Sequence, residues 1–175
     1  MILAPADVGG VVAALAKVAD PWAKLFSHSK VVSAGVLFFH LAPLVFAAGA
    51  AFTTDRATLR ATKAGAGASE RARQLQEIAA SHRVVVSGLA LSFTSGILLF
   101  LSDVETFFGS VFWWIKLALV GSLLLNGFLM TRTEKALERS GEDVALWARM
   151  RTIAVMSAVL WLATTLAGVV LKEFA

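Results

Sequence analysis

Four stretches of the chain, each 19 to 22 residues long, hold a single charged side chain between them. They are residues 31–52, 84–102, 111–130 and 152–171. A helix needs about 20 apolar residues to cross the hydrocarbon core of a bilayer. Membrane-spanning strands would give shorter segments of alternating polarity, and open sheet edges are not tolerated in lipid. The sequence therefore predicts an all-α fold, an integral membrane four-helix bundle.

The composition supports the same fold class. Of 175 residues, 58% are hydrophobic and 16% are charged, whereas soluble domains carry roughly 25% charged residues. The apolar excess predicts contact with the lipid bilayer. The chain has no cysteine, which excludes disulfides, thiolate metal sites and cysteine nucleophiles. The pI is near 9.9, but the basic residues are confined to connections between the spans, so we expect no nucleic-acid partner.

Residues 1–30 are predicted to form a separate N-terminal segment, and residues 31–175 the bundle. The segment lacks a basic start and contains Asp7, so a secretory signal is not expected. Asp20 and Pro21 resemble an N-cap followed by the first helical residue, which predicts a new helix there. The apolar positions recur with the spacing of an amphipathic helix lying in the membrane interface; they are Val8, Val11, Val12, Leu15, Val18 and Trp22.

The connections predict the orientation of the bundle. The first connection carries six Lys and Arg residues and the third carries five, whereas the second has none and holds Asp103 and Glu105. By the positive-inside rule, the basic connections face the cytoplasm of a bacterial inner membrane and both termini face the periplasm. We expect the basic connections to be helical, with Ser69 capping the helix of the second span and Gly141 ending that of the third. The aromatic residues of the second connection predict an interfacial belt.

Small and polar residues mark the faces of membrane helices that pack together. They follow one seam on each span, which predicts a common interior. The seams are Ser33, His40, Ala47 and Ala51; Gly88, Ser92, Ser95 and Ser102; Lys116, Leu123 and Gly127; and Ser157, Trp161, Thr164 and Gly168.

His40 is the clearest candidate functional residue, because a histidine near the bilayer midplane is costly and is usually functional. One interpretation is a neutral imidazole bonded to a hydroxyl of Ser92, Ser95 or Thr164. The other is axial ligation of haem b, a familiar use of histidine in bundle cores. Pro43 frees the carbonyl of Phe39 and is expected to bend the helix beside the histidine.

The other two histidines are not expected to share an iron with His40. His82 lies roughly 20 Å away along the membrane normal, at 1.5 Å per residue, and His28 lies outside the outer boundary. We expect both to be interfacial. Lys116 either snorkels to the outer surface or faces the seam near His40, where it could pair with a haem propionate or an acidic substrate. Asp103 and Glu105 are its competing partners.

Three segments resemble known families. They are His40 followed nine positions later by Gly49, "TSGILLF" (94–100) and "FWWIKLALVGSLLLNG" (112–127). Together they resemble copper-resistance D-type membrane domains and the four-helix bacterial membrane protoporphyrinogen oxidase, which binds haem b, over roughly residues 36–130. The resemblance implies that His40 is a haem-ligand candidate and that Lys116 matches the family's third-helix lysine.

The chain also departs from the oxidase pattern. Asn126 and Gly127 stand where the oxidase has a tyrosine-histidine pair, and Ala47 stands where it has a tryptophan. These departures put the oxidase activity in doubt. The layout "SHSK…FFHL…DRATLR" is also similar to a group of small four-helix membrane proteins that offers no activity to transfer.

Several functions are therefore left open by the sequence. The first is a haem-b redox or porphyrin-handling protein with His40 as iron ligand and with Lys116, Asn126 and Trp161 at the cofactor; no catalytic residue is predicted. The second is a non-catalytic accessory subunit that binds membrane-protein partners or forms a homo-oligomer. Copper or small-solute handling is weaker, because the predicted spans hold no acidic residue and no cysteine.

Overall fold

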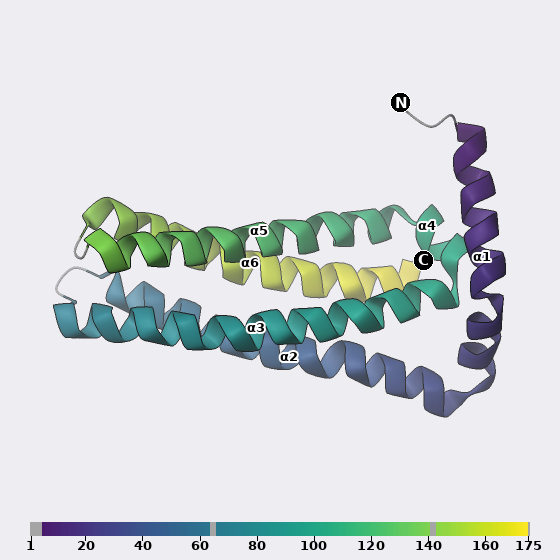
Figure 1. Cartoon of the computed structure of the whole chain (residues 1–175), viewed down its shortest axis with the longest axis horizontal. Coiled ribbons are helices and arrows are strands. Elements are labelled where there is room, and N and C mark those ends of the chain that lie inside the picture. Colours follow the sequence, from purple (N-terminus) through teal and green to yellow (C-terminus); the bar gives the residue numbers. More distant parts are fainter. Residues whose placement is uncertain (1–4, 64–65, 141–142, 175) are drawn as a thin grey trace.

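The computed structural model describes residues 5–63, 66–140 and 143–174, and every regular element in these ranges is a helix. Four long helices lie alongside one another, and the first helix runs across one end of them (Figure 1). The predicted all-α bundle is therefore confirmed. The elements are α1 (Pro5–His28), α2 (Lys30–Ala61), α3 (Ala68–Ser102), α4 (Val104–Gly109), α5 (Val111–Ser140) and α6 (Val144–Phe174).

Each predicted span lies within one of the long helices, and all four of these are long and apolar enough to cross a membrane. With 35 residues, α3 is about 52 Å long, which exceeds the roughly 30 Å of a hydrocarbon core. The helices therefore continue beyond the membrane, as predicted for the basic connections. We call the end where α2 joins α3 and α5 joins α6 the basic end, and the opposite end the α1 end.

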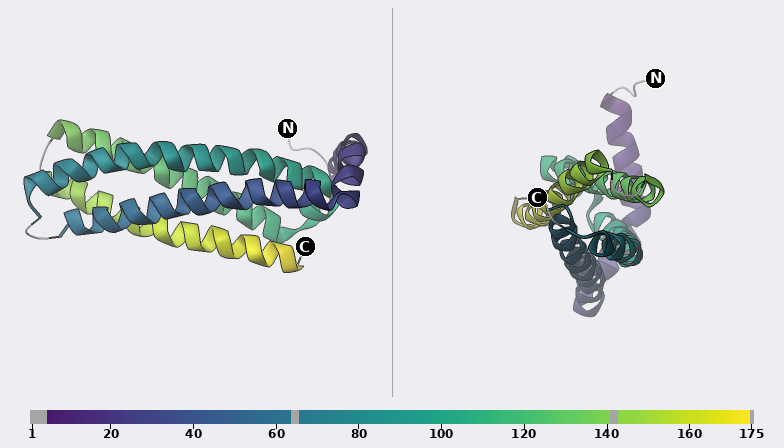
Figure 2. Two further views of the ribbon diagram at one scale, coloured as in Figure 1. Left: turned by 90° about the horizontal axis from the view of Figure 1, so that it is seen from below. Right: turned by 90° about the vertical axis from the view of Figure 1, so that its left-hand side faces the viewer.

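The four long helices form two close pairs. α2 packs along most of α3, and α5 packs along α6, while α2 also contacts α6. By contrast, α3 and α5 touch only lightly. Viewed along the bundle, the pairs lie side by side (Figure 2). The bundle is thus closed on three sides and loosely packed on the fourth, between α3 and α5.

The interior contains two apolar clusters. One, within the predicted spans, joins Ala47 and Ala51 to Leu123 and Trp161. The other lies beyond the spans at the basic end and comprises Ala61, Ile78, Leu137, Trp147 and Met150. Large apolar side chains elsewhere on the spans point outward, among them Phe38, Phe46, Phe128 and Leu162. Lipid is the solvent that such a surface requires.

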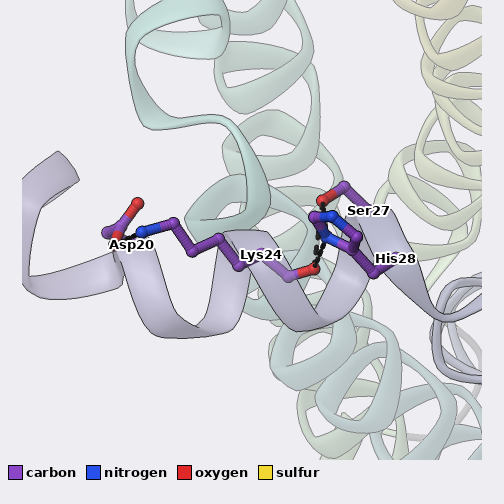
Figure 3. A network of polar contacts seen from close by, with 4 residues as sticks. All are labelled: Asp20, Lys24, Ser27 and His28. Atoms are coloured by element: carbon purple, nitrogen blue, oxygen red, sulfur yellow. Dashed lines mark hydrogen bonds and ion pairs between the residues drawn. The ribbon is translucent and has the colours of Figure 1, made fainter.

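The start of the bundle differs from the prediction. α1 continues through Pro21 to His28, so the predicted new helix at Asp20 and Pro21 is wrong. Asp20 does not cap a helix; its carboxylate accepts a hydrogen bond from Lys24 at 2.6 Å on the exposed side of α1 (Figure 3). The chain turns instead at Ser29, whose extended backbone and side-chain oxygen, which accepts from the N–H of Val32, begin α2.

The predicted cap of the second span is also wrong. The N-cap of α3 is Gly67, which makes no side-chain hydrogen bond there, and the helix starts at Ala68. Ser69 is therefore already inside the first turn and cannot be the cap. Gly141 lies outside the described residues, and α5 is described as far as Ser140.

The α1 end is held together by α1, α4 and aromatic rings. α1 rests on α2, α3 and α4, and the Trp22 indole N–H donates to the carbonyl of Leu98 at 2.8 Å. The acidic connection forms α4, and the ring of Trp113 stacks on Phe100 at 5.0 Å. One flank of α1 buries Ala19, while apolar side chains on the next flank are exposed: Val11, Leu15, Val18 and Leu25. The interfacial position of α1 stays a prediction.

Candidate functional site

His40 is bound to α3 through its Nδ1 atom. Nδ1 lies 2.9 Å from the carbonyl oxygen of Ser92 and 3.2 Å from Oγ of Ser95. A carbonyl can only accept, so the hydrogen-bond network assigns the proton to Nδ1. In the neutral imidazole, Nε2 is then the nitrogen with a free lone pair. The predicted partners Ser92 and Ser95 are thus found beside His40, whereas the Thr164 hydroxyl has no partner in the described structure.

The same serines compensate for the proline in α2. Pro43 deprives the carbonyl of Phe39 of its helical partner, and Ser95 Oγ lies 3.2 Å from that oxygen as a donor. Ser92 Oγ donates to the carbonyl of His40 at 3.1 Å. Each serine therefore joins α3 to the backbone of α2 close to the bend, which makes this polar group a structural link between two helices.

Two glycines of α3 permit this close approach. A Cβ atom at Gly88 would lie 2.7 Å from the carbonyl oxygen of Pro43 and 2.9 Å from the Cβ of Ala47. A Cβ at Gly96 would lie 3.3 Å from Cε1 of His40. The imidazole therefore already occupies the space that the missing side chain of Gly96 leaves.

Lys116 enters the same region from α5. A Cβ at Gly168 on α6 would lie 3.7 Å from its Nζ, so the ammonium packs against α6. The expected competitors do not pair with it in the ranges described, because Asp103 accepts from the N–H of Thr106 and Glu105 forms no ion pair. Lys116 therefore turns toward α6 and the interior, as the seam-facing alternative predicts, and not toward an acidic partner.

The surroundings of His40 meet only one requirement of haem ligation. A histidine ligand commonly donates its second ring N–H to a carbonyl or carboxylate, as Nδ1 does here. A tetrapyrrole also needs space beside the ring, and neither of the two cavities described below is lined by His40. The Nδ1 bond thus gives the imidazole a ligand-like orientation, while the two cavities lie elsewhere.

Asn126 and Trp161, the other predicted cofactor residues, lie apart from His40 around a cavity of about 280 Å³. All four long helices contribute to its wall. Its apolar lining includes Val85, Leu89, Leu123 and Phe128. Its polar lining consists of Thr54, Asp55, Ser81, His82, Asn126, Thr131 and Ser157.

Asp55 is the most unusual residue of this cavity. Its side chain is 3% exposed, and its Oδ2 atom has no hydrogen-bond partner in the part of the chain that the structure describes. The carboxyl interacts with the Ser157 hydroxyl of α6. An unpaired, buried carboxyl oxygen is rare because its desolvation is costly. Asp55 therefore lines the cavity with a carboxyl that has one unpartnered, buried oxygen.

Asn126 adds a second acceptor. Its amide nitrogen donates to the carbonyl of Ile153 at 3.2 Å, which links α5 to α6. The amide oxygen is then the atom left for the cavity. Trp161 lines the cavity and also belongs to the apolar cluster beside it.

Sequence reasoning missed Asp55 and the contribution of His82 to the cavity wall. Asp55 was read as part of a cytoplasmic connection, yet it follows Ala47 and Ala51 at intervals of four residues. This spacing continues the inward seam past Phe52, and it is the signal that could have revealed the residue. His82 is half-buried and lines the same cavity, and its interfacial position stays a prediction.

A second hollow of about 560 Å³ lies at the basic end and holds none of the predicted site residues. Arg71, Trp147 and Arg151 contribute to its wall, and the Arg71 guanidinium lies 5.4 Å from the centre of the Trp147 ring. Across the described ranges, no three His, Asp or Glu side chains are grouped as a metal ion would require.

Comparison with protein-family models, with curated proteins and with solved structures found no match.

Proposed function

We propose that this multi-pass membrane protein binds an amphiphilic small molecule, which enters the bundle sideways from the lipid. The observation that carries the proposal is the Asp55 cavity, because it combines an unsatisfied carboxyl with an opening on the loosely packed side of the bundle. Ligand cavities in helix bundles have this character: they are mostly apolar, with a few polar groups placed to orient the ligand.

The lining residues support a lateral entrance. Val86 of α3 and both Leu124 and Phe128 of α5 line the cavity, yet they are 48%, 53% and 57% exposed. Residues that face both the cavity and the lipid must lie at its mouth. The mouth is therefore between α3 and α5, where the two helices touch only lightly.

The proposed orientation follows the charge distribution. With the basic end in the cytoplasm of a bacterial inner membrane and both termini in the periplasm, the cavity opens to the inner leaflet. An amphiphile there would present its head near Asp55 and its tail between α3 and α5.

Two glycines of α5 allow a matched test. A side chain added at Gly127 or at Gly121 meets open space, but only Gly127 lines the cavity. The probe is a long-chain alcohol with a photoreactive diazirine beside its hydroxyl, and the protein is held in phosphatidylcholine nanodiscs. We expect labelling of residues near Asp55 and Asn126, with most of it lost in Gly127→Leu and retained in Gly121→Leu. Equal labelling of the two variants would refute the cavity as a binding site.

Haem b at His40 is a second candidate, favoured by the bond from Nδ1 to the Ser92 carbonyl. It requires space for a porphyrin beside the imidazole, and neither of the two cavities provides it. An absorption spectrum after expression with ample haem tests it: a Soret band that His40→Ala abolishes would support it, and its absence would end it. An accessory-subunit role, homo-oligomerisation and copper or solute handling stay predictions.

A further inference from the structure

We infer that the cavity selects amphiphiles whose head group is a protonated amine, which pairs with the Asp55 carboxylate. This inference rests on the proposed function and adds the chemical class of the ligand. Three features of the head-group region argue for a cation: the buried carboxyl, a second acceptor and an aromatic ring.

The carboxyl supplies the strongest preference. Asp55 forms no ion pair with any Lys or Arg in the described ranges, and its carboxyl interacts with the Ser157 hydroxyl. A buried carboxyl without a counter-charge favours its neutral form, because ionising it there is costly. A bound ammonium would stabilise the carboxylate form and would donate a charge-assisted hydrogen bond to it.

The other two features suit the same head group. An ammonium has three donors and no acceptor, and the Asn126 amide oxygen provides a further acceptor in the same cavity. The ring of Trp161 also lines this cavity, and the face of an indole attracts cations. A carboxylate head would meet repulsion from Asp55.

The tail has a separate, apolar path. Val86, Leu124 and Phe128 border the mouth between α3 and α5. A ligand bound through Asp55 therefore leaves its chain in contact with the lipid, so chain length contributes little to selection.

The experiment uses three compounds with the same tail: dodecylamine, dodecanol and dodecanoate. Each competes with the diazirine alcohol for the intact protein in phosphatidylcholine nanodiscs. For every compound we measure the concentration that halves labelling in the wild type and in Asp55→Asn. The ratio of these two concentrations cancels the partition of the compound into the bilayer. Asp20→Asn is the matched control, since it removes an exposed carboxylate of α1.

We expect Asp55→Asn to weaken competition by dodecylamine by about tenfold or more, as loss of a charge-assisted hydrogen bond predicts. Competition by dodecanol should change much less, and Asp20→Asn should change neither. Asp55→Glu keeps the negative charge and should retain the preference for the amine. This result would show that the loss in Asp55→Asn comes from the missing charge and not from misfolding of the variant.

Two results separate this inference from the proposed function. An equal change for amine and alcohol in Asp55→Asn would overturn the amine selectivity, while a labelling loss in Gly127→Leu would keep the cavity as a binding site. Unchanged labelling in Gly127→Leu would overturn both.

Discussion

His40 and Asp55 lie on the same helix, about 22 Å apart at 1.5 Å per residue, and their surroundings differ. The Nδ1 of His40 is bonded to the Ser92 carbonyl, and the adjacent serines bond the backbone near Pro43. Asp55 has an oxygen without a partner in the described structure and lines a cavity. A polar residue in a membrane helix can thus hold the helices together or remain available for a ligand, and the number of its satisfied hydrogen bonds distinguishes the two cases.

The same contrast applies to the glycines of neighbouring helices. Gly88 of α3 is in tight contact with α2, whereas Gly127 of α5 borders open space. The α2–α3 seam is therefore optimised for packing, and the α3–α5 side is not. The four predictions below test this contrast by thermal unfolding in detergent micelles or by hydrogen exchange.

The largest effect is expected at Gly88. In Gly88→Ala the new methyl group would clash with the Pro43 carbonyl and with Ala47, and overpacking of this kind costs about 1–3 kcal/mol. The melting temperature should fall by several degrees. Gly121→Ala is the control, and it should melt unchanged or slightly higher because alanine favours a helix by about 1 kcal/mol over glycine. Equal melting temperatures for the two variants would contradict the close packing of α2 against α3 at Gly88.

A smaller loss is expected for His40→Ala. The substitution removes the hydrogen bond to Ser92 and leaves a gap beside Gly96, and buried hydrogen bonds between membrane helices are worth about 0.6–1.7 kcal/mol. The melting temperature should decrease by a few degrees. His28→Ala provides the comparison, because its ring bonds only within exposed α1 (Figure 3). A melting temperature equal to that of His28→Ala would show that His40 is not a link.

Trp22→Phe extends the contrast to the α1 end. The ring shape is kept, but the 2.8 Å bond to the Leu98 carbonyl is lost, at a cost of about 1 kcal/mol. Hydrogen exchange should become faster along α1 and stay unchanged in α5 and α6. Uniformly faster exchange would mean that α1 is needed by the whole bundle.

The smallest effect is expected for Asp55→Asn. The amide has the size of the carboxyl, and Oδ2 has no described partner to lose, so the free energy of unfolding should change by less than about 0.5 kcal/mol. The melting temperature should stay within a degree or two of the wild type, roughly. If the melting temperature fell as much as in His40→Ala, Asp55 would have a structural role. Its carboxyl would then not be free to bind a ligand.

Much of the architecture was predictable from the sequence because bilayer thickness dictates the length of an apolar span. The inward seams were predictable as well, and Ala47, Ser92, Ser95, Ser157 and Trp161 are all buried. The errors occur at helix ends. Neither Asp20 nor Ser69 caps a helix, because a cap depends on the backbone conformation of one residue, and several nearby residues can supply it.

The candidate site was only partly predictable. The sequence placed His40, Lys116, Asn126 and Trp161 in one interior, but in the structure only Asn126 and Trp161 line the Asp55 cavity. The difference arises from depth along the bundle. Asp55 was overlooked because the predicted span ended at Phe52, although the helical seam continues to it.

By itself, the sequence determined the four spans and the face that each turns inward, because apolar length and helical periodicity are local properties of the chain. Only the tertiary structure decided which polar groups are satisfied and where space remains. Those features depend on how closely α2, α3, α5 and α6 approach one another, and that distance is determined by contacts between residues far apart in the sequence.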